Sequence, residues 1–527
     1  NLQVDDTSVD ETDSDGVPLL QASATIIDYK TGQVKVLIGG RGNQPPTSLN
    51  RAYFDLKSIG STTKPLTVYG PAIDTKLITA GTPLDDTSVS EEILEKYNFG
   101  SVVPKNADGS MFGYITAREA LTYSKNLTSI KTVDMLGLDT ALNYGKKAGL
   151  KYAPQSHTMS ALALGQFDQP IGNRDGGNTT ILASAYGAFG NNGVIYEPAL
   201  YTKVEDASGN LLLEKEPIST KLFSPQTSYI IYDILKGSST SAQFNDIPVA
   251  GKTGTTNSSD NFWFAGLTPY YSGSVWIGYD NPQRMNGKSS SAASLFSKIM
   301  AVAHEGLEYK DIEKPSGLVE AKVCKDSGKS PTDLCYEDQR GNRVKTEYFI
   351  DGTQPKSVCD IHVSVSVNSS NNKLANKNTP SRLIEDKVFI NKPNANPNAD
   401  DYPFVVPTRE DDTKAEEYIK LSEIGLRADM DLYDAIVILN NRGIKYKIHG
   451  ASVASNISSG QYTLVSFTEK IKNSETVKLN VKVTTNTPDE NIGNNGNNHN
   501  RDTSTSDTDA EAHRTSISDI INGLFNH

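Results

Sequence analysis

The residues best suited to chemistry are a serine and a lysine in the segment GSTTKP. Ser61 precedes Lys64 by three positions. On a helix this spacing puts the two side chains on one face, one turn apart, so that the amine can reach the hydroxyl. A serine hydroxyl is a weak nucleophile by itself, and a neutral lysine amine is one group that accepts its proton. The pair predicts a serine nucleophile with a lysine base, although S-x-x-K alone arises by chance in many chains.

Two further motifs follow along the chain and strengthen this prediction. In YSKN, Ser124 and Asn126 flank a lysine. In AGKTGTT, the residues of interest are Lys252, Thr253, Gly254 and Thr255. Taken singly, these motifs also fit a serine at a helix end and a β-strand that enters a glycine turn. In this order, S-x-x-K, S-x-N and K-T-G match the joint signature of serine β-lactamases and penicillin-binding proteins.

The polar side chains of these motifs have defined tasks in such a site. The hydroxyl of Ser124 can relay a proton to a leaving amine, and the Asn126 amide can hold the substrate backbone or the lysine. Lys252 contributes positive charge for a terminal carboxylate of the substrate. The hydroxyls of Thr253 and Thr255 can bind the oxygens of that carboxylate.

Backbone groups of the same motifs complete the expected site. Gly254 has no side chain, which lets a peptide approach the strand edge closely. An oxyanion hole needs two backbone donors, and we expect them to be the N–H of Ser61 at a helix start and the N–H of Thr255 on a strand.

The region from Leu19 to about His304 resembles the transpeptidase domain of class A, bifunctional penicillin-binding proteins of the 1A type. The resemblance extends well beyond the three motifs, to the segments LQASATIIDYKTGQVKVLIGGRG, GSTTKPLTVYGPAID, ITAREALTYSKNLTSIKTVDMLG, LASAYGAFGNNGVIYEPALYTKVED and VAGKTGTTNSSDNFWFAGLTP. It implies an acyl transfer on peptidoglycan stem peptides, which reach the enzyme as lipid-linked wall precursor.

The resemblance also implies a role for each motif residue. Ser61 would attack the D-Ala-D-Ala amide and release the terminal D-alanine, with Lys64 as general base. Ser124, Asn126 and Lys252 would complete the proton relay and the substrate site. An amine of a second stem peptide would then resolve the acyl-enzyme as a cross-link. β-Lactams would acylate the same serine, and the chemistry needs neither a metal nor an organic cofactor.

Two features depart from the pattern of this family. Ile59 stands two residues before the serine, where the family usually has proline, although no catalytic group is lost. Members of this class also carry a membrane anchor and a glycosyltransferase domain before the transpeptidase, and neither is present here. Since the chain begins with Asn1, we expect it to be cut from a longer, membrane-anchored protein that acts on the outer face of the cytoplasmic membrane.

Three alternatives share the acylating serine and lysine. A class A β-lactamase adds a glutamate that activates the deacylating water, and no convincing counterpart occurs between Asn126 and Lys252. A D,D-carboxypeptidase also hydrolyses its acyl-enzyme, and the long similarity to the 1A type argues against both enzymes. The third alternative is a non-catalytic penicillin sensor that retains the fold as a receptor.

The composition of the chain argues against two classes of binding partner. The chain of 527 residues has a net charge of -12, which provides no basic surface for nucleic acid or for an anionic membrane. No stretch approaches the roughly 18 to 20 apolar residues that span a bilayer. The acidic start of the chain is unlike a signal peptide.

Hydrophobic patterns predict an α+β fold of the penicillin-binding, β-lactamase-like type, an antiparallel sheet flanked by helices. Residues 21–40 alternate as a β-hairpin, SGSVWIGYD reads as a strand, and SLFSKIMAVAHEGL reads as a helix with one apolar stripe. We expect an acidic N-terminal remnant (1–18), the transpeptidase domain (19–310), a cysteine-containing accessory segment (311–390), a linker (391–411), a small α+β domain (412–484) and a disordered tail (485–527).

The accessory segment contains all three cysteines. Cys324, Cys335, Cys359 and His362 form a C-x10-C-x23-C-x2-H set. This spacing fits no common zinc module. In an exported domain a disulfide between Cys324 and Cys335 with one spare thiol is the more natural expectation, and we favour it over zinc.

The small domain at 412–484 combines a predicted helix with strands, among them VKLNVKV. It is weakly similar to a PASTA-type wall-binding module but has no diagnostic residue. A small accessory domain that only packs or spaces is the favoured alternative.

Overall fold

The structure is a computed structural model that describes residues 11–167, 175–238, 240–392, 395–413, 418–450, 457–472 and 475–484. The chain divides into two compact units, Asn1–Ala415 and Glu416–His527. The expectations for the first ten residues and for the disordered tail at 485–527 lie outside the described residues. No helix among the described residues is long and apolar enough to cross a membrane.

A five-stranded antiparallel sheet is the centre of the first unit, in the order β2-β1-β11-β10-β9. Its strands are β1 (Leu20–Asp28), β2 (Gln33–Ile38), β9 (Ala250–Thr255), β10 (Asn261–Leu267) and β11 (Ser272–Tyr279). The predicted hairpin is confirmed, because β1 pairs with β2 across a turn in which Gly32 has a φ of +79°. Residues of β10 and β11 are buried along their whole length, so both faces of the sheet must be covered.

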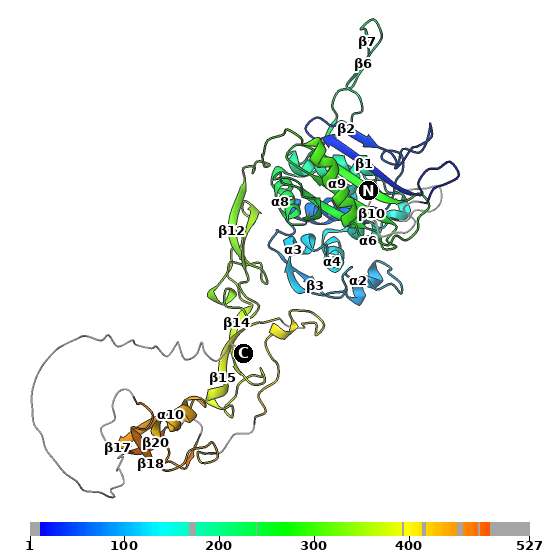
Figure 1. Cartoon of the computed structure of the whole chain (residues 1–527). Coiled ribbons are helices and arrows are strands. Elements are labelled where there is room, and N and C mark those ends of the chain that lie inside the picture. The colour runs from blue at the N-terminus through cyan, green and yellow to red at the C-terminus, as the bar shows by residue number, and fades with distance from the viewer. Residues whose placement is uncertain are drawn as a thin grey trace, which may run out of the picture. The chain divides into compact units, whose positions relative to one another are not determined.

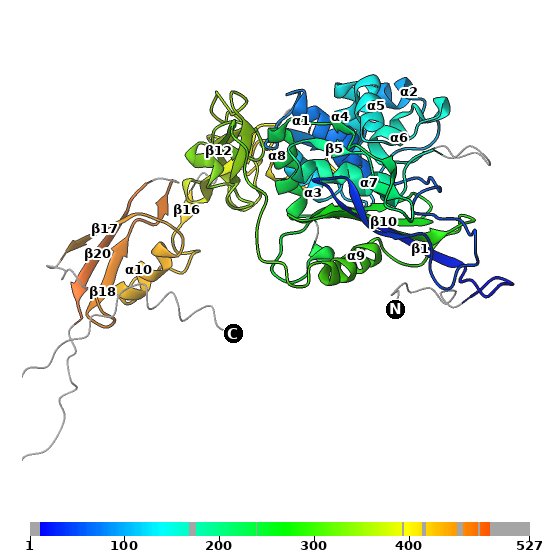
Figure 2. The ribbon, with the colours of Figure 1, turned by 90° about the horizontal axis from the view of Figure 1, so that it is seen from above.

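Helices cover the two faces of this sheet. Figure 2 shows α9 (Ser290–Ala303) on one side and α7 (Thr179–Gly187) on the other. The apolar stripe of α9 inserts Phe296 and Met300 into a cluster with Phe264 on one face of the sheet. On the other face of the sheet, Trp263 and Trp276 pack against the larger helical core. The predicted α+β fold with an antiparallel sheet flanked by helices is confirmed.

The remaining elements of the transpeptidase region complete the helical layer and its surface loops. The helices are η1 (Gly60–Thr63), η2 (Pro65–Tyr69), α1 (Gly70–Asp74), α2 (Glu91–Lys96), α3 (Ala117–Thr122), α4 (Asn126–Leu136), α5 (Leu138–Lys147), η3 (Pro154–Ser156), α6 (Met159–Leu164), η4 (Ala188–Gly190), α8 (Pro225–Lys236) and η5 (Thr240–Ala242). The short strands are β3 (Pro83–Asp86), β4 (Gly113–Thr116), β5 (Val194–Tyr196), β6 (Lys203–Glu205), β7 (Leu211–Glu214) and β8 (Ser219–Lys221).

Two antiparallel ribbons follow the transpeptidase region (Figure 1). Their elements are β12 (Leu318–Cys324), η6 (Asp333–Cys335), β13 (Val344–Ile350), β14 (His362–Asn368), η7 (Ser381–Leu383) and β15 (Ile384–Ile390). The first ribbon is tied to the helical layer, because Arg118 of α3 donates to the buried carboxylate of Glu347 on β13 at 2.6 Å.

The expected disulfide is wrong. Cys324, Cys335 and Cys359 are all buried free thiols. Cys324 and Cys359 are not bridged either, because their Sγ atoms are 3.7 Å apart and a disulfide bond is roughly 2.05 Å long. Spacing along the sequence suggested a bridge across the short loop from Cys324 to Cys335, but the fold brings three sulfur atoms and His362 into one group instead.

The stretch for which composition predicts an extended linker, 391–411, contains η8 (Tyr402–Phe404). The buried carboxylate of Asp401 pairs with Lys392 at 3.0 Å and accepts the backbone N–H of Tyr114 at 3.0 Å. The described part of this stretch therefore makes specific contacts with the transpeptidase region. The domain boundaries expected from composition remain a prediction.

Among its described residues, the second unit contains a helix and two small sheets. Its elements are β16 (Ile419–Lys420), α10 (Leu432–Asn440), β17 (Tyr446–Gly450), β18 (Tyr462–Phe467), β19 (Lys470–Ile471) and β20 (Val477–Val483). β20 lies between β17 and β18, and α10 contributes Leu432, Ala435 and Leu439 to a core with Leu464 and Leu479. The predicted helix and strands are confirmed, whereas a wall-binding role remains a prediction.

Candidate active site

The predicted nucleophile lies on a distorted helix at the centre of the first unit. Ser61 is in η1, a 3₁₀ turn whose C-terminal cap is Lys64, and the chain then continues into the π-helical turn η2. In a 3₁₀ helix, residues three apart lie one above the other. The expected placement of Ser61 and Lys64 on one helical face therefore holds, with tighter winding than an α-helix has.

The nucleophile turn approaches strand β9 backbone to backbone. Gly60 has a φ of +55°, and a Cβ there would lie 2.5 Å from the carbonyl oxygen of Thr255. A Cβ on Gly254 would likewise lie 2.4 Å from the carbonyl oxygen of Ile59. Only glycine fits at both positions. This approach brings the backbone of the serine turn beside that of the K-T-G strand, as an oxyanion hole built from both would require.

Ile59, the residue that departs from the usual proline, is completely buried. The backbone N–H groups of Ile59 and Gly60 both donate to the carbonyl oxygen of Gly165, at 3.1 Å each. Gly165 has a φ of +68° and ends α6. The turn is thus held from outside by α6, without a proline ring.

Lys64 is buried among acceptors of the YSKN motif. Its Nζ lies 2.7 Å from the carbonyl oxygen of Ser124 and 2.8 Å from Oδ1 of Asn126. The Ser124 hydroxyl is farther away, at 3.5 Å. Burial lowers the pKa of Lys64 well below its ordinary value, and the positive charge of Lys252 lowers this pKa further. A lowered pKa makes the neutral amine, the form that accepts a proton, accessible near neutral pH.

Lys252 contributes a second buried amine from β9. Burial lowers its pKa to about 7. Of the residues that follow it, Thr253 is half-buried, Gly254 is buried and Thr255 is exposed. The strand therefore presents a charge that titrates near neutral pH, next to threonine hydroxyls that a ligand can reach.

Lys125, between the two YSKN residues that we expected to act, has a positioning role that the sequence did not reveal. Its buried ammonium pairs with Asp108 at 3.0 Å and with the buried Asp86 at 3.5 Å, and it lies 3.4 Å from the centre of the Phe112 ring. The backbone of Ser124 has a φ of +59°, so the turn is strained at this point. The ion pairs of this buried ammonium hold the strained turn in place.

Asn106 fixes the same turn from the other side. Its Oδ1 accepts the backbone N–H of Asn126 at 2.7 Å, and its amide donates to Asp86 at 2.7 Å. The only sequence signal for these supports was the lysine at the middle position of YSKN. Asn106 and Asp86 come from a loop and from strand β3, which the motif does not include.

The structure thus brings together most of the predicted site. Hydrogen bonds join Lys64 to Ser124 and to Asn126. The positive charge of Lys252 contributes to the lowered pKa of Lys64. The serine turn and the K-T-G strand are joined through their glycines.

Comparison with known proteins identifies the family. A family model for the penicillin binding protein transpeptidase domain matches residues 22–301, and a model for the penicillin-binding protein 1A C-terminal domain matches residues 314–364. The chain is 52% identical over 379 residues to penicillin-binding protein 1A of Clostridium perfringens, which covers 70% of this chain and 46% of that protein. It is 44% identical over 390 residues to penicillin-binding protein 1A of Clostridium botulinum, covering 72% and 46% of the two chains.

The chain spans about half the length of these curated relatives. The fold is also that of a solved structure, penicillin-binding protein 1A from Haemophilus influenzae, with a TM-score of 0.54 at 21% identity over 65% of this chain and 55% of that one. The family match spans more than half of the chain and includes all three motifs and both glycine contacts. This chain belongs to the penicillin-binding protein transpeptidase family.

Proposed function

We propose that this chain is the part of a longer protein that cross-links peptidoglycan stem peptides through an acyl-enzyme on Ser61. The observation that carries the proposal is the buried amine of Lys64, held by Ser124 and Asn126 beside the turn that bears the serine. A desolvated lysine in this position is a base for a serine that has no histidine partner. Substrate would be the D-Ala-D-Ala end of a stem peptide, and β-lactams would occupy the same site.

The first half-reaction forms the acyl-enzyme. The neutral amine of Lys64 takes the hydroxyl proton of Ser61 while the serine oxygen attacks the carbonyl carbon of the penultimate D-alanine. The backbone N–H groups of Ser61 and Thr255 stabilise the negative charge that develops on the carbonyl oxygen. The proton then passes through the Ser124 hydroxyl to the amine of the terminal D-alanine, which leaves when the C–N bond breaks.

The second half-reaction forms the cross-link. The amine of another stem peptide attacks the ester carbonyl and loses a proton to Lys64. The ester bond breaks, and the oxygen of Ser61 recovers its proton. During the first half-reaction, the ammonium of Lys252 and the hydroxyls of Thr253 and Thr255 bind the terminal carboxylate of the donor, which then departs with the terminal D-alanine. A substrate attached to the membrane surface places this reaction on the outer face of the cytoplasmic membrane.

Labelling by a fluorescent penicillin tests the proposal. We expect one adduct per chain, located on the Ser61 peptide by mass spectrometry and lasting for hours. Incubation with a D-Ala-D-Ala peptide and an amine acceptor should release D-alanine and form the cross-linked product. Rapid loss of the adduct would indicate a β-lactamase. Release of D-alanine with hydrolysis alone would indicate a carboxypeptidase, and a stable adduct without turnover would indicate a sensor.

The pH dependence of acylation should separate the two buried lysines. The rate should rise with pH through the lowered pKa of Lys64, because only the neutral amine accepts a proton. It should fall as pH rises past about 7, where Lys252 loses the charge that binds the penicillin carboxylate. The predicted profile is therefore bell-shaped, and the second-order acylation rate measured across pH checks it.

Replacement of Lys252 by arginine provides the matched control for this profile. A guanidinium stays charged at every accessible pH. The Lys252→Arg variant should therefore lose the alkaline limb and keep the acid limb, whatever its absolute rate. An unchanged alkaline limb in this variant would contradict the assignment.

A further inference from the structure

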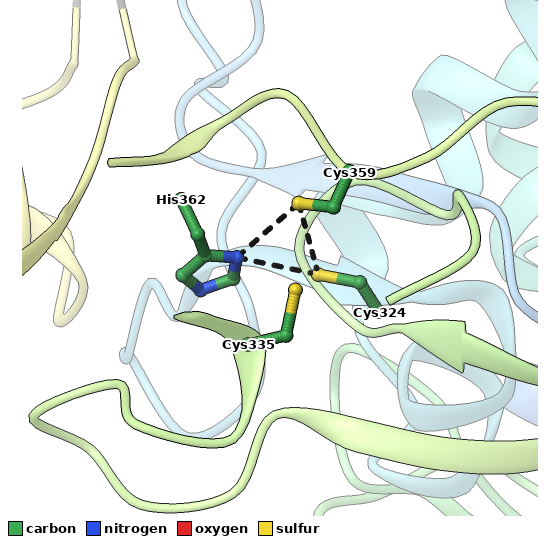
Figure 3. A group of neighbouring side chains, drawn as sticks. All are labelled: Cys324, Cys335, Cys359 and His362. Atoms are coloured by element: carbon green, nitrogen blue, oxygen red, sulfur yellow. Dashed lines mark hydrogen bonds between the residues drawn. The ribbon is translucent and has the colours of Figure 1, made fainter. Parts of the chain in front are cut away.

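The three cysteines and one histidine converge from separate parts of the ribbon segment (Figure 3). Cys324 ends β12, Cys335 ends η6, Cys359 precedes the second ribbon, and His362 begins β14. The exposed fractions of the four residues are 0%, 0%, 6% and 3%, respectively. In Figure 3 the three sulfur atoms are gathered beside one edge of the imidazole ring.

The distances within this group match those of a tetrahedral zinc site. The Sγ atoms of Cys324 and Cys359 are 3.7 Å apart and lie 3.5 Å and 3.4 Å from Nδ1 of His362. Zinc–sulfur bonds of about 2.3 Å and a zinc–nitrogen bond of about 2.05 Å at tetrahedral angles predict about 3.8 Å between two sulfurs and about 3.6 Å between sulfur and nitrogen. The sulfur of Cys335 lies within 4.8 Å of the other three ligand atoms, as a fourth vertex requires.

The groups around the ligands orient them as the outer shell of a metal site does. Nε2 of His362 lies 2.9 Å from Oδ2 of the buried Asp338, which leaves Nδ1 as the nitrogen that faces the sulfurs. A histidine ligand commonly donates its other N–H to a carboxylate in this way. Cys335 Sγ faces the backbone N–H and the hydroxyl of Thr332, at 3.4 Å and 3.6 Å.

A second arrangement, with a cation between His362, Asp326 and Asp338, fits less well. Both carboxylates are already engaged by arginines: Arg340 bridges Asp326 and Asp338, and Arg343 pairs with Asp326 at 2.9 Å. These guanidinium groups would oppose a cation on that side of the ring.

Apolar packing between the two ribbons is small at this point. Among the described residues, the buried members of the cluster here are the three cysteines, with half-buried Val344 and Ile361 packed against them. Isolated two-stranded ribbons are marginally stable in water. Small modules without a sufficient core are commonly stabilised by a disulfide or a metal, and the thiols are free.

We propose that Cys324, Cys335, Cys359 and His362 bind one structural zinc ion that joins the β12–β13 ribbon to the β14–β15 ribbon. Three thiolates and one imidazole fill the four positions that zinc prefers, so no position is left for a substrate. Binding releases the three thiol protons to solvent, and no oxidation is involved. This role is separate from the transpeptidase reaction and does not depend on the proposed acyl-enzyme.

Metal analysis of the full chain, purified without chelators and dialysed against zinc-free buffer, tests this proposal. We expect about one zinc per chain, three thiols that become reactive only after a strong chelator is added, and a lower melting temperature once the metal is removed. Replacement of the bound metal by cobalt should give the visible absorption of tetrahedral cobalt–thiolate coordination, which requires no variant.

Three variants test the proposed ligands, the outer-shell carboxylate and a control position. Cys335→Ser should lose zinc while still forming the penicillin adduct. Asp338→Asn should keep the site but weaken zinc binding by about 10–100-fold, as expected for an outer-shell carboxylate. The matched control is Lys329→Ala, which breaks an exposed ion pair with Asp360 in the same segment and should keep the full zinc content.

Three results would overturn the proposal. The first is an intact mass lower by a pair of hydrogens without zinc, which would show a disulfide. The second is three free, reactive thiols that stay metal-free after incubation with zinc. The third is a stoichiometric content of iron in place of zinc.

Discussion

Replacement of Lys64 by methionine is expected to slow acylation of Ser61 by a penicillin by about 10³-fold, within the range that general-base catalysis contributes. Methionine has nearly the length of lysine and fills the buried space, but it cannot accept a proton. The Lys64 amine lies 2.7 Å from Ser124 O and 2.8 Å from Asn126 Oδ1, so the variant removes the base that we propose for Ser61. Stopped-flow measurement of the second-order acylation rate checks this prediction.

The Lys64→Arg variant tests whether Lys64 acts as a base or only as a positive charge. Arginine keeps the charge but does not release its proton in proteins, so it should be about as slow as methionine. Lys35→Met, on the exposed face of β2, is a matched control that should acylate at the native rate. Native acylation by Lys64→Arg would mean that Lys64 acts only electrostatically and that another group takes the serine proton.

Loss of the Lys64 amine also leaves Ser124 O and Asn126 Oδ1 without their donor, which costs about 1–3 kcal/mol of stability. Melting temperatures of both variants should therefore be compared with that of the native chain. A variant that is folded at the assay temperature and still acylates slowly supports a chemical role. One that regains its rate on cooling would indicate a structural role only.

The sequence predicted those parts of the site that depend on short-range spacing. Ser61 and Lys64 lie one turn apart because a 3₁₀ turn, like an α-helix, keeps residues three positions apart on one side. Alternation within residues 21–40 predicted a hairpin, because a period-2 pattern can be read without knowledge of distant partners. The apolar stripe of α9 could also be predicted, because it depends only on the spacing of residues within one helix.

The parts that the sequence did not predict depend on contacts between distant segments. Lys125 reaches Asp86 and Asp108, which lie 39 and 17 positions earlier in the chain, and no local pattern encodes that meeting. The positive φ of Ser124 is equally invisible, because a serine carries no signal for a left-handed turn as glycine does.

The cysteine segment shows the same limit. Ten residues between Cys324 and Cys335 suggested a bridge across a short loop, and the C-x10-C-x23-C-x2-H spacing matched no familiar zinc module. The four residues lie together because the two ribbons are in contact: Cys324 and Cys335 belong to the first ribbon, Cys359 precedes the second, and His362 begins it. Spacing rules work where ligands share one hairpin or helix, and these four do not.

Replacement of Arg118 by methionine is expected to destabilise the first unit by about 3–5 kcal/mol, as expected when one partner of a buried ion pair is removed. The Arg118 guanidinium donates to Glu347 of β13 at 2.6 Å and to Asp233 of α8 at 2.7 Å. The side chain of Glu347 has no exposed surface, so without Arg118 its charge would be buried and poorly compensated. This ion pair joins the transpeptidase region to the ribbon segment.

Urea unfolding followed by tryptophan fluorescence measures this change in the free energy of unfolding. The chain has two tryptophans, Trp263 and Trp276, and both are buried in the sheet core of the first unit. Their emission therefore reports that unit and is insensitive to the second. Lys314→Met is the matched control, because its ion pair with Glu320 is about half exposed on both sides and should be worth less than about 1 kcal/mol.

A double variant separates the cost of an unpaired charge from the value of the pair itself. Arg118→Met combined with Glu347→Met replaces both charges by apolar side chains, and such exchanges are often close to neutral. The double variant should therefore be more stable than Arg118→Met alone, even though it carries one more substitution. If the two losses simply add, or if Arg118→Met costs no more than Lys314→Met, the ion pair does not hold the ribbon segment to the transpeptidase region.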